Sequence, residues 1–155
     1  MAQILRPDAD ISRRYFQTSA GGITGLYAFV NDESDLTYLY SPSTSGNGYV
    51  VLGLPAPSPP KDGNSTVYFR LRETAFDNPM TISIYEGASL IASHAYNLNK
   101  EWTLESFEVA LTDYSDLRIR VECNPNYIGC YQISELWVEV PDAEASAGLE
   151  MGCNF

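Results

Sequence analysis

One short stretch concentrates reactive side chains at a corner of the chain. In "TDYSDLRIRVE" (112–122), two aspartates, a tyrosine and a serine precede a strictly alternating run. Such a group can be a metal site, a catalytic corner or a turn. Aspartate carboxylates commonly accept hydrogen bonds from backbone N–H groups in turns. We therefore expect Asp113 and Asp116 to make the turn, and Tyr114 and Leu117 to pin it to the core.

A second candidate is the carboxylate pair Glu135 and Glu139, which flanks Trp137 in "ISELWVEV". A glycosidase needs two acids about 5 to 9 Å apart across a sugar-binding cleft. The pair can share a face if the strand carries a bulge, and Trp137 would then be an aromatic platform between them. An ordinary solvated strand face explains the same residues without a catalytic role, and we favour this interpretation. Glu105 and Glu108 fall on opposite faces and cannot line one cleft.

The remaining reactive residues do not form a recognisable catalytic or metal-binding pattern. His94 is the only histidine, and the chain has no G-x-S-x-G elbow for a nucleophile. "NDESD" (31–35) has the composition of a calcium loop but lacks its ligand spacing. Three scattered cysteines and one histidine do not supply a zinc site. The sequence therefore offers no catalytic, cofactor-binding or metal-ligating residue, and it predicts a protein that is not an enzyme.

Net charge limits the classes of binding partner, and cysteine usage bears on disulfide formation. The 155 residues carry a formal net charge of −11, which repels phosphate backbones and anionic lipid. We expect neither a nucleic-acid partner nor a membrane partner, and no stretch is long and apolar enough for a membrane span. The N-terminal residues lack the pattern of an export signal. Without export, buried thiols are favoured over a Cys123–Cys130 bond across "NPNYIG", although that bond stays open; Cys153 is the third cysteine.

Alternating strands are the elements that position these residues. Val67, Phe69 and Leu71 fall on one face of "TVYFRLRE" (66–73), and "TISIYEGASLIASHAY" (81–96) predicts a hairpin. Similar alternation marks "SFEVALT" and "ISELWVEV", and shorter apolar runs precede residue 54. About eight to ten strands with Gly, Pro and Asn turns predict an all-β fold, an antiparallel, jelly-roll-like β-sandwich with extended N- and C-terminal arms.

Composition divides the chain into three parts. Residues 1–20 are predicted to be an N-terminal arm, residues 21–141 the β-sandwich domain, and residues 142–155 a small, acidic C-terminal tail. The proline-rich segment 54–64 is expected to be a stiff crossover between the sheets. The eleven tyrosines are the compositional excess of the chain. Many are expected in the sandwich, and some, with Trp102 and Trp137, on its surface. Exposed aromatic rings serve either sugar stacking or protein interfaces.

The order of these motifs resembles a known family. "TDYSDLRIRVE" followed by "LWVEVP" is similar to the C-terminal signature of small β-sandwich virion proteins of tailed bacteriophages. "LRPDADIS" (5–12), "GLYAFVNDESDLTYLYSP" (25–42), "VYFRLR" (67–72) and "TISIYEGASLIAS" (81–93) follow the family's order. The resemblance covers roughly residues 4–141. The tail and the cysteine pair around "NPNYIG" depart from it.

The resemblance implies a virion structural protein, with capsid decoration (cement) on the outer surface of the head shell as the leading role. The protein would be made in the host cytoplasm and would bind the major capsid protein and neighbouring copies of itself, with a trimer suiting three-fold positions. Its expected interface residues are Arg6, Arg13, Arg14, Tyr15, Trp137 and Phe155.

Three alternatives remain. One is a carbohydrate-binding β-sandwich module of a tail or head fibre that stacks sugars on Trp137 and surface tyrosines. Another is a structural component of the neck or tail. The last is a small glycosidase that depends on Glu135 and Glu139, which we disfavour because no cleft pattern accompanies them.

Overall fold

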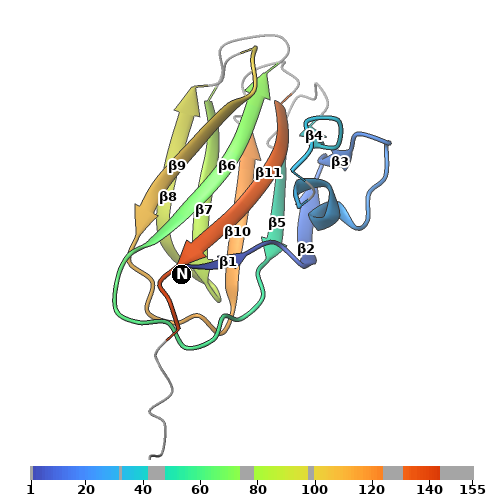
Figure 1. Ribbon diagram of the computed structural model, residues 1–155. Coiled ribbons are helices and arrows are strands. Elements are labelled where there is room, and N and C mark those ends of the chain that lie inside the picture. The colour runs from blue at the N-terminus through green and yellow to red at the C-terminus, as the bar shows by residue number, and fades with distance from the viewer. Residues whose placement is uncertain are drawn as a thin grey trace, which may run out of the picture.

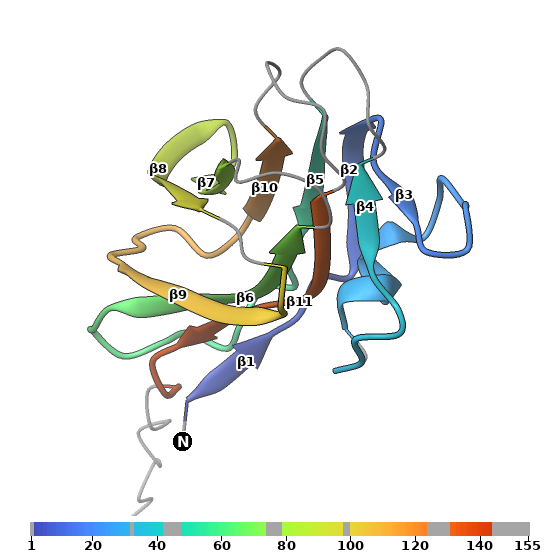
Figure 2. The same ribbon diagram turned by 90° about the horizontal axis from the view of Figure 1, so that it is seen from above.

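The protein is a sandwich of two antiparallel β-sheets, as the alternation predicts. The computed structural model describes residues 2–31, 33–41, 48–73, 79–97, 100–123 and 131–143. One sheet lies in front of the other in Figure 1, and the view from above shows the two layers (Figure 2). No α-helix occurs in the described ranges; a single 3-10 turn, η1 (Leu26–Val30), contacts β11, β2, β3 and β4.

The two sheets have different strand orders. Sheet A runs β3-β4-β11-β6-β9, with β1 also paired to β11, and sheet B runs β2-β5-β10-β7-β8. The strands of sheet A are β1 (Gln3–Leu5), β3 (Gln17–Thr18), β4 (Leu39–Ser41), β6 (Ser65–Glu73), β9 (Thr103–Val109) and β11 (Tyr131–Val140). Those of sheet B are β2 (Ala9–Arg14), β5 (Tyr49–Gly53), β7 (Pro79–Glu86), β8 (Ser89–Asn97) and β10 (Leu117–Cys123).

Strict alternation builds the core between the sheets. In β6 and β10 every second side chain is buried, because successive residues of a strand point to opposite faces. The buried set includes the residues that the pattern assigned to the core: Val67, Phe69, Leu71, Phe107, Val109, Leu117, Ile119, Val121, Leu136, Val138 and Val140. The same parity places the charged residues of β6 and β10 on the outer faces of the two sheets.

Residues 3–18 contribute strands to both sheets. The segment predicted as an arm contains β1, which pairs with the C-terminal half of β11, and β2, which pairs with β5. β3 adds a short pairing to β4. The boundaries between the arm, the domain and the tail stay predictions. The strands within the arm pair with strands of the sandwich.

The proline-rich segment 54–64 crosses from β5 in sheet B to β6 in sheet A, as predicted. The Gln3 side chain holds it: its amide nitrogen donates to the Ser58 carbonyl at 3.0 Å, and its oxygen accepts from the Ser58 N–H at 2.9 Å. Lys61 N–H donates to the Asp142 carbonyl at 2.7 Å. The crossover is therefore tied to both chain ends of the sandwich.

Cys123 ends β10 and is buried. Cys130, Cys153 and Phe155 lie outside the described residues, so the expectations about the cysteine pair and the docking tail stay predictions. Among the described residues, no helix is long and apolar enough to cross a membrane.

The corner at 112–117 is architectural, and Glu86 at the end of β7 organises it. The Glu86 carboxylate accepts hydrogen bonds from the backbone N–H groups of Thr112 and Asp113, and from the Thr112 hydroxyl. Asp113 in turn accepts from Ser115 N–H at 2.9 Å, as a turn-forming aspartate should. Tyr114 packs against the core, and Leu117 is buried.

Replacing Glu86 tests this corner. Glu86→Ala removes the acceptor of two solvent-exposed backbone N–H groups, and we expect it to lower the free energy of unfolding by about 0.5–1.5 kcal/mol. Urea unfolding followed by fluorescence measures the change. Glu101→Ala, which alters an exposed side chain, is the matched control. Equal stability of the two variants would contradict the assignment.

Candidate functional site

The outer face of sheet A carries an aromatic row whose rings are already in contact with protein groups. Trp137 lies directly opposite Tyr68, and their rings stack with centroids 5.0 Å apart and planes 10° apart. On the other side of β11, where β1 pairs, the guanidinium carbon of Arg6 lies 5.6 Å from the centre of the Trp137 ring. Trp137 is thus held between Tyr68 and Arg6, and neither ring face is open as a sugar platform.

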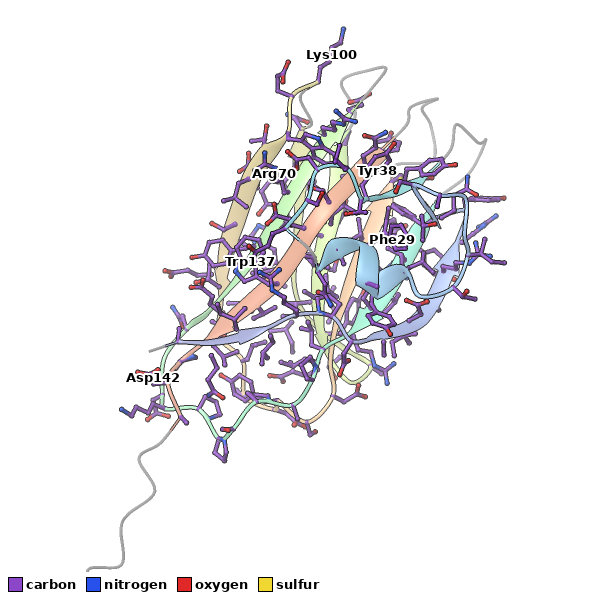
Figure 3. All side chains as sticks on the ribbon, turned by 45° about the vertical axis from the view of Figure 1, so that its right-hand side comes forward. Phe29, Tyr38, Arg70, Lys100, Trp137 and Asp142 are labelled. Atoms are coloured by element: carbon purple, nitrogen blue, oxygen red, sulfur yellow. The ribbon has the colours of Figure 1, made fainter. Side chains whose placement is uncertain are left out.

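The loop after η1 lies across the outer face of sheet A. Glu33 pairs with Arg6, and Asp35 accepts from Arg70 at 2.8 Å and from the Ser134 hydroxyl at 3.1 Å. Figure 3 shows Trp137, Arg70 and Tyr38 on this side of the sheet, with η1 beside them. The two described acids of the "NDESD" segment are therefore structural anchors rather than calcium ligands.

A second aromatic group ends the same face. The Arg72 guanidinium carbon lies 4.5 Å from the Trp102 ring centre and 5.9 Å from that of Tyr38, and Arg72 Nε donates to the Gln132 side-chain oxygen at 2.5 Å. Tyr38 also packs against Trp102 at 6.0 Å. These polar and aromatic groups of sheet A therefore contact one another.

The carboxylate pair does not form a glycosidase site. The bulge in β11 lies at Ser134, before the pair, so Glu135 and Glu139 share the outer face by simple alternation. This corrects the expectation that the two residues share a face only if the strand carries a bulge. Their Cα atoms are about 13 Å apart along the strand, with Trp137 between them, whereas the carboxyl groups of a catalytic pair lie about 5 to 9 Å apart.

The outer face of sheet B has an open hollow beside its central strand. Cross-strand register places Arg118 between Gly53 of β5 and Tyr85 of β7, and Arg120 between Val51 and Ser83. A hollow of about 200 Å³, here called the β10 hollow, is lined by Ile11, Ser12, Val51, Tyr85, Gly87, Ala88, Arg118 and Arg120. Ile11, the bulge residue of β2, packs against Gly53. A Cβ atom on residue 53 would lie 3.3 Å from Ile11 Cδ1, so glycine leaves room for this contact.

Tyr85 is the half-buried aromatic ring of this hollow. Within the described residues, neither an aromatic nor a cationic side chain stacks on it. Tyr49 lies further along the same face, 4.4 Å beneath the Arg120 guanidinium carbon. Tyr85 is therefore available to a ligand in a way that Trp137 is not.

Each arginine of the β10 hollow has its own carboxylate. Arg118 donates from Nε and Nη2 to both oxygens of Asp116, at 2.9 and 2.7 Å. Arg120 pairs with Glu122 at 2.8 Å. Arg118 has further guanidinium N–H groups that these two bonds do not use, and they can donate to ligand oxygens. The site thus offers hydrogen-bond donors with nearly balanced charge.

A second hollow adjoins the corner. It measures about 400 Å³ and is lined by Pro60, Lys61, Asp62, Gly63, Leu111, Thr112 and Tyr114. Its aromatic residue, Tyr114, packs against the core, and its Thr112 hydroxyl is bonded to Glu86. The aromatic ring and the threonine hydroxyl of this second hollow are therefore already engaged by protein groups.

The interface residues expected from the sequence do not form one surface. Arg6 and Trp137 lie together on sheet A. Arg13, Arg14 and Tyr15 lie at the end of β2 in sheet B, where Arg13 donates to the Phe16 carbonyl and Arg14 stacks over Tyr15 at 5.0 Å. Tyr15 has a positive φ of 67° and bridges to Tyr49. Phe155 lies outside the described residues.

The remaining candidates have structural surroundings. His94 of β8 is exposed, and its ring centre lies 4.5 Å from that of Phe107 across the gap between the sheets. Among the described residues, no group of three or more His, Cys, Asp or Glu side chains could hold a metal ion.

Sequence reasoning missed the β10 hollow. The alternation of Arg118, Arg120 and Glu122 was visible, but the residues that complete the hollow come from β2, β5 and β7. Only the pairing register brings Tyr85 and Val51 beside the two arginines.

Comparison with known proteins identifies the fold and no family. No family model matches the chain, and no curated protein matches it. Among solved structures, the carbohydrate-binding module CBM6cm-2 of a Cellvibrio mixtus lichenase, in complex with cellotriose, is similar over 93% of this chain and 100% of that one, with a TM-score of 0.54 at 12% identity.

Two further structures are similar at equally low identity. The CBM22-1 xylan-binding domain of Paenibacillus barcinonensis Xyn10C covers 92% of this chain and 97% of its own, with a TM-score of 0.57 at 10% identity. The enzymatically active domain of tailspike protein 4 of bacteriophage CBA120 covers 90% of this chain, with a TM-score of 0.54 at 10% identity; the match spans 19% of that chain. These likenesses establish the jelly-roll β-sandwich.

The corner beside the β10 hollow makes stability depend on pH. Hydrogen bonds from Ser115 lower the pKa of Asp113, and the hydrogen bond from Arg118 lowers the pKa of Asp116. Their contribution is complete above the unfolded pKa of about 3.9 and is lost as pH falls through the lower folded values. We expect the melting temperature of Asp113→Asn/Asp116→Asn to fall less between pH 5 and pH 2.5 than that of wild type. Parallel curves would contradict the assignment.

Proposed function

We propose that this protein is a non-catalytic carbohydrate-binding module that holds a neutral glycan on the outer face of sheet B. The observation that carries the proposal is the open Tyr85 ring beside the charge-balanced donors Arg118 and Arg120. An aromatic ring accepts the apolar C–H face of a sugar, while neighbouring N–H groups donate to its hydroxyl oxygens. Solved structures with this sandwich include a carbohydrate-binding module in complex with cellotriose and a xylan-binding domain.

The shape of the site suits a chain lying on a surface. Its volume of about 200 Å³ is below the roughly 300–1,000 Å³ of small-molecule pockets that enclose their ligands. A shallow platform of this kind leaves both ends of a glycan chain in solvent. The proposed ligand is therefore a polysaccharide segment rather than a free monosaccharide.

Charge favours a neutral glycan over an acidic one. Asp116 and Glu122 already neutralise the two arginines, and the whole chain carries −11. A uronate or sulfate group would have to displace a protein carboxylate and approach an acidic surface. Hydroxyl groups meet neither obstacle.

Two aromatic substitutions, one on each sheet, test the site. Tyr85→Ala should lower affinity for the bound neutral polysaccharide at least tenfold, because stacking and apolar contact are lost together. Trp137→Ala should leave that affinity within about twofold, after near-ultraviolet circular dichroism confirms folding. Affinity electrophoresis against neutral glucans, xylans and galactans, with pectin and alginate as acidic comparators, finds the ligand, and calorimetry measures it.

The outcomes separate the alternatives. A loss of binding in Trp137→Ala alone would move the site to sheet A. Preferential binding of the acidic polymers, weakened by salt, would contradict the neutral-ligand assignment. If wild type binds no polysaccharide, the proposed function is wrong. Lys61→Ala, which alters the second hollow, is the control for that region.

The virion setting is a separate proposal that rests on the sequence resemblance. A carbohydrate-binding module suits a tail or head fibre, and the bacteriophage tailspike among the similar folds is compatible with that setting. Capsid decoration stays the other proposed role. A decoration protein coats a lattice in hundreds of copies and relies on avidity, whereas a fibre module is present in few copies.

Copy number distinguishes the two settings. We expect quantitative mass spectrometry of purified particles to find tens of copies or fewer per virion if the protein belongs to a fibre. Hundreds of copies, together with binding of the purified protein to expanded capsids, would favour decoration and contradict the fibre setting. Deleting residues 1–14 is a poor test of either, because it removes β1 and β2 from the sheets.

A further inference from the structure

Strand β8 (Ser89–Asn97) is an edge strand without the usual protection. Its neighbour among the described strands is β7, and it lies at the lateral end of sheet B (Figure 2). It is nine residues long and contains no charged residue, proline or glycine. Natural proteins normally block such an edge, because its unpaired N–H and C=O groups can accept another strand.

The other edges of the described sheets carry protection. β9 has Glu105 and Glu108, and β2 has one acid, two arginines and a bulge between Asp10 and Ser12. β1 and β3 are only three and two residues long. Among the edge strands that the structure describes, β8 is therefore the exception, because it is long and carries neither a charge nor a proline.

The backbone of β8 is regular where a partner would bind. Its one bulge, at Ile91, lies near the turn, and the strand pairs without interruption with β7 from Ala92 to Asn97. On the inner side, His94 contacts Phe107 and Tyr96 contacts Phe69, with ring centres 4.5 and 4.7 Å apart. These rings close the gap between the sheets, which leaves the backbone edge as the available contact.

We propose that two copies of this protein pair antiparallel through β8 to form a dimer with a continuous sheet. A two-fold axis at Ser93 sets Ser93 of one copy opposite Ser93 of the other, and Ala92 opposite His94. No like charges meet in this register. Elsewhere the −11 charge of each copy opposes association, so the uncharged strand is where two copies can approach. The symmetric contact uses both edges and closes at two copies.

The dimer brings two β10 hollows onto one face, where both can bind the same glycan. This consequence rests on the proposed function. In each copy β7 lies between β10 and β8, so the path from one β10 to the other crosses five inter-strand spacings. At about 4.8 Å each, these place the two hollows about 24 Å apart on one face. A glycan long enough to span both hollows would bind with avidity, and a short oligosaccharide would not. Dimerisation therefore selects for polymers.

Lysine substitutions on the two edge strands test the interface. Ser93→Lys places a charge at the two-fold axis opposite its own copy. Ala95→Lys adds a charge at an exposed position without removing a side-chain hydrogen bond, whereas the Ser93 hydroxyl is bonded to Ser83. Ser106→Lys is the control, on the exposed outer side of the other edge strand, β9. Sedimentation velocity over roughly 1 to 100 µM should show wild type and Ser106→Lys forming dimers with rising concentration, and both β8 variants remaining monomeric. Circular dichroism confirms that each variant is folded.

Binding measurements keep the two proposals apart. The monomeric variants should bind a short oligosaccharide with wild-type affinity and the polymer at least tenfold more weakly. Wild type that stays monomeric throughout, or folded β8 variants that dimerise like wild type, would overturn the dimer without affecting glycan binding at Tyr85. Wild type that dimerises through β8 but binds no glycan would leave the dimer standing and remove the proposed function.

Discussion

The double pairing of β10 is the constraint on which both the core and the candidate site depend. β10 pairs with β5 on one side and with β7 on the other, without a register shift on either side. Its period of two buries Leu117, Ile119 and Val121, and the same parity places Arg118 and Arg120 on the outer face. A slip of one residue would bury the arginines and expose the core. Burial of the apolar residues therefore fixes the geometry of the hollow.

The fold was predictable because the information for it is local. Alternation identified the inward residues of β6, β9, β10 and β11, and the glycine-containing turn identified the β7–β8 hairpin. The aspartates of the corner were predicted as turn-formers, and Asp113 has that role. The short N-terminal strands were less predictable. β1 and β3 are three and two residues long, too short for a periodic pattern, and they pair with strands far away in the sequence.

The candidate site was less predictable because it depends on register. Trp137 looked like a platform in the sequence, since nothing local shows that Tyr68 and Arg6 will contact its ring from two sides. Tyr85 looked ordinary, since nothing local shows that Gly53 and Val51 will leave room around its neighbours Arg118 and Arg120. Cross-strand pairing decides whether an aromatic residue is structural or available. A single sequence gives alternation but not the partner strand.

The two outer faces differ in how their polar groups are satisfied, and this difference bears on function. On sheet A, rings stack on rings or guanidinium groups, and the 31–38 loop adds carboxylates to Arg6 and Arg70. A ligand there would have to replace contacts that already satisfy these groups, so most of its own contacts would yield little net affinity. On sheet B, the acids pair with the arginines along the same strand or from the adjacent turn, and Tyr85 remains open. Charge is balanced there without being covered, which is the condition under which a neutral, hydroxyl-rich ligand can bind without displacing anything.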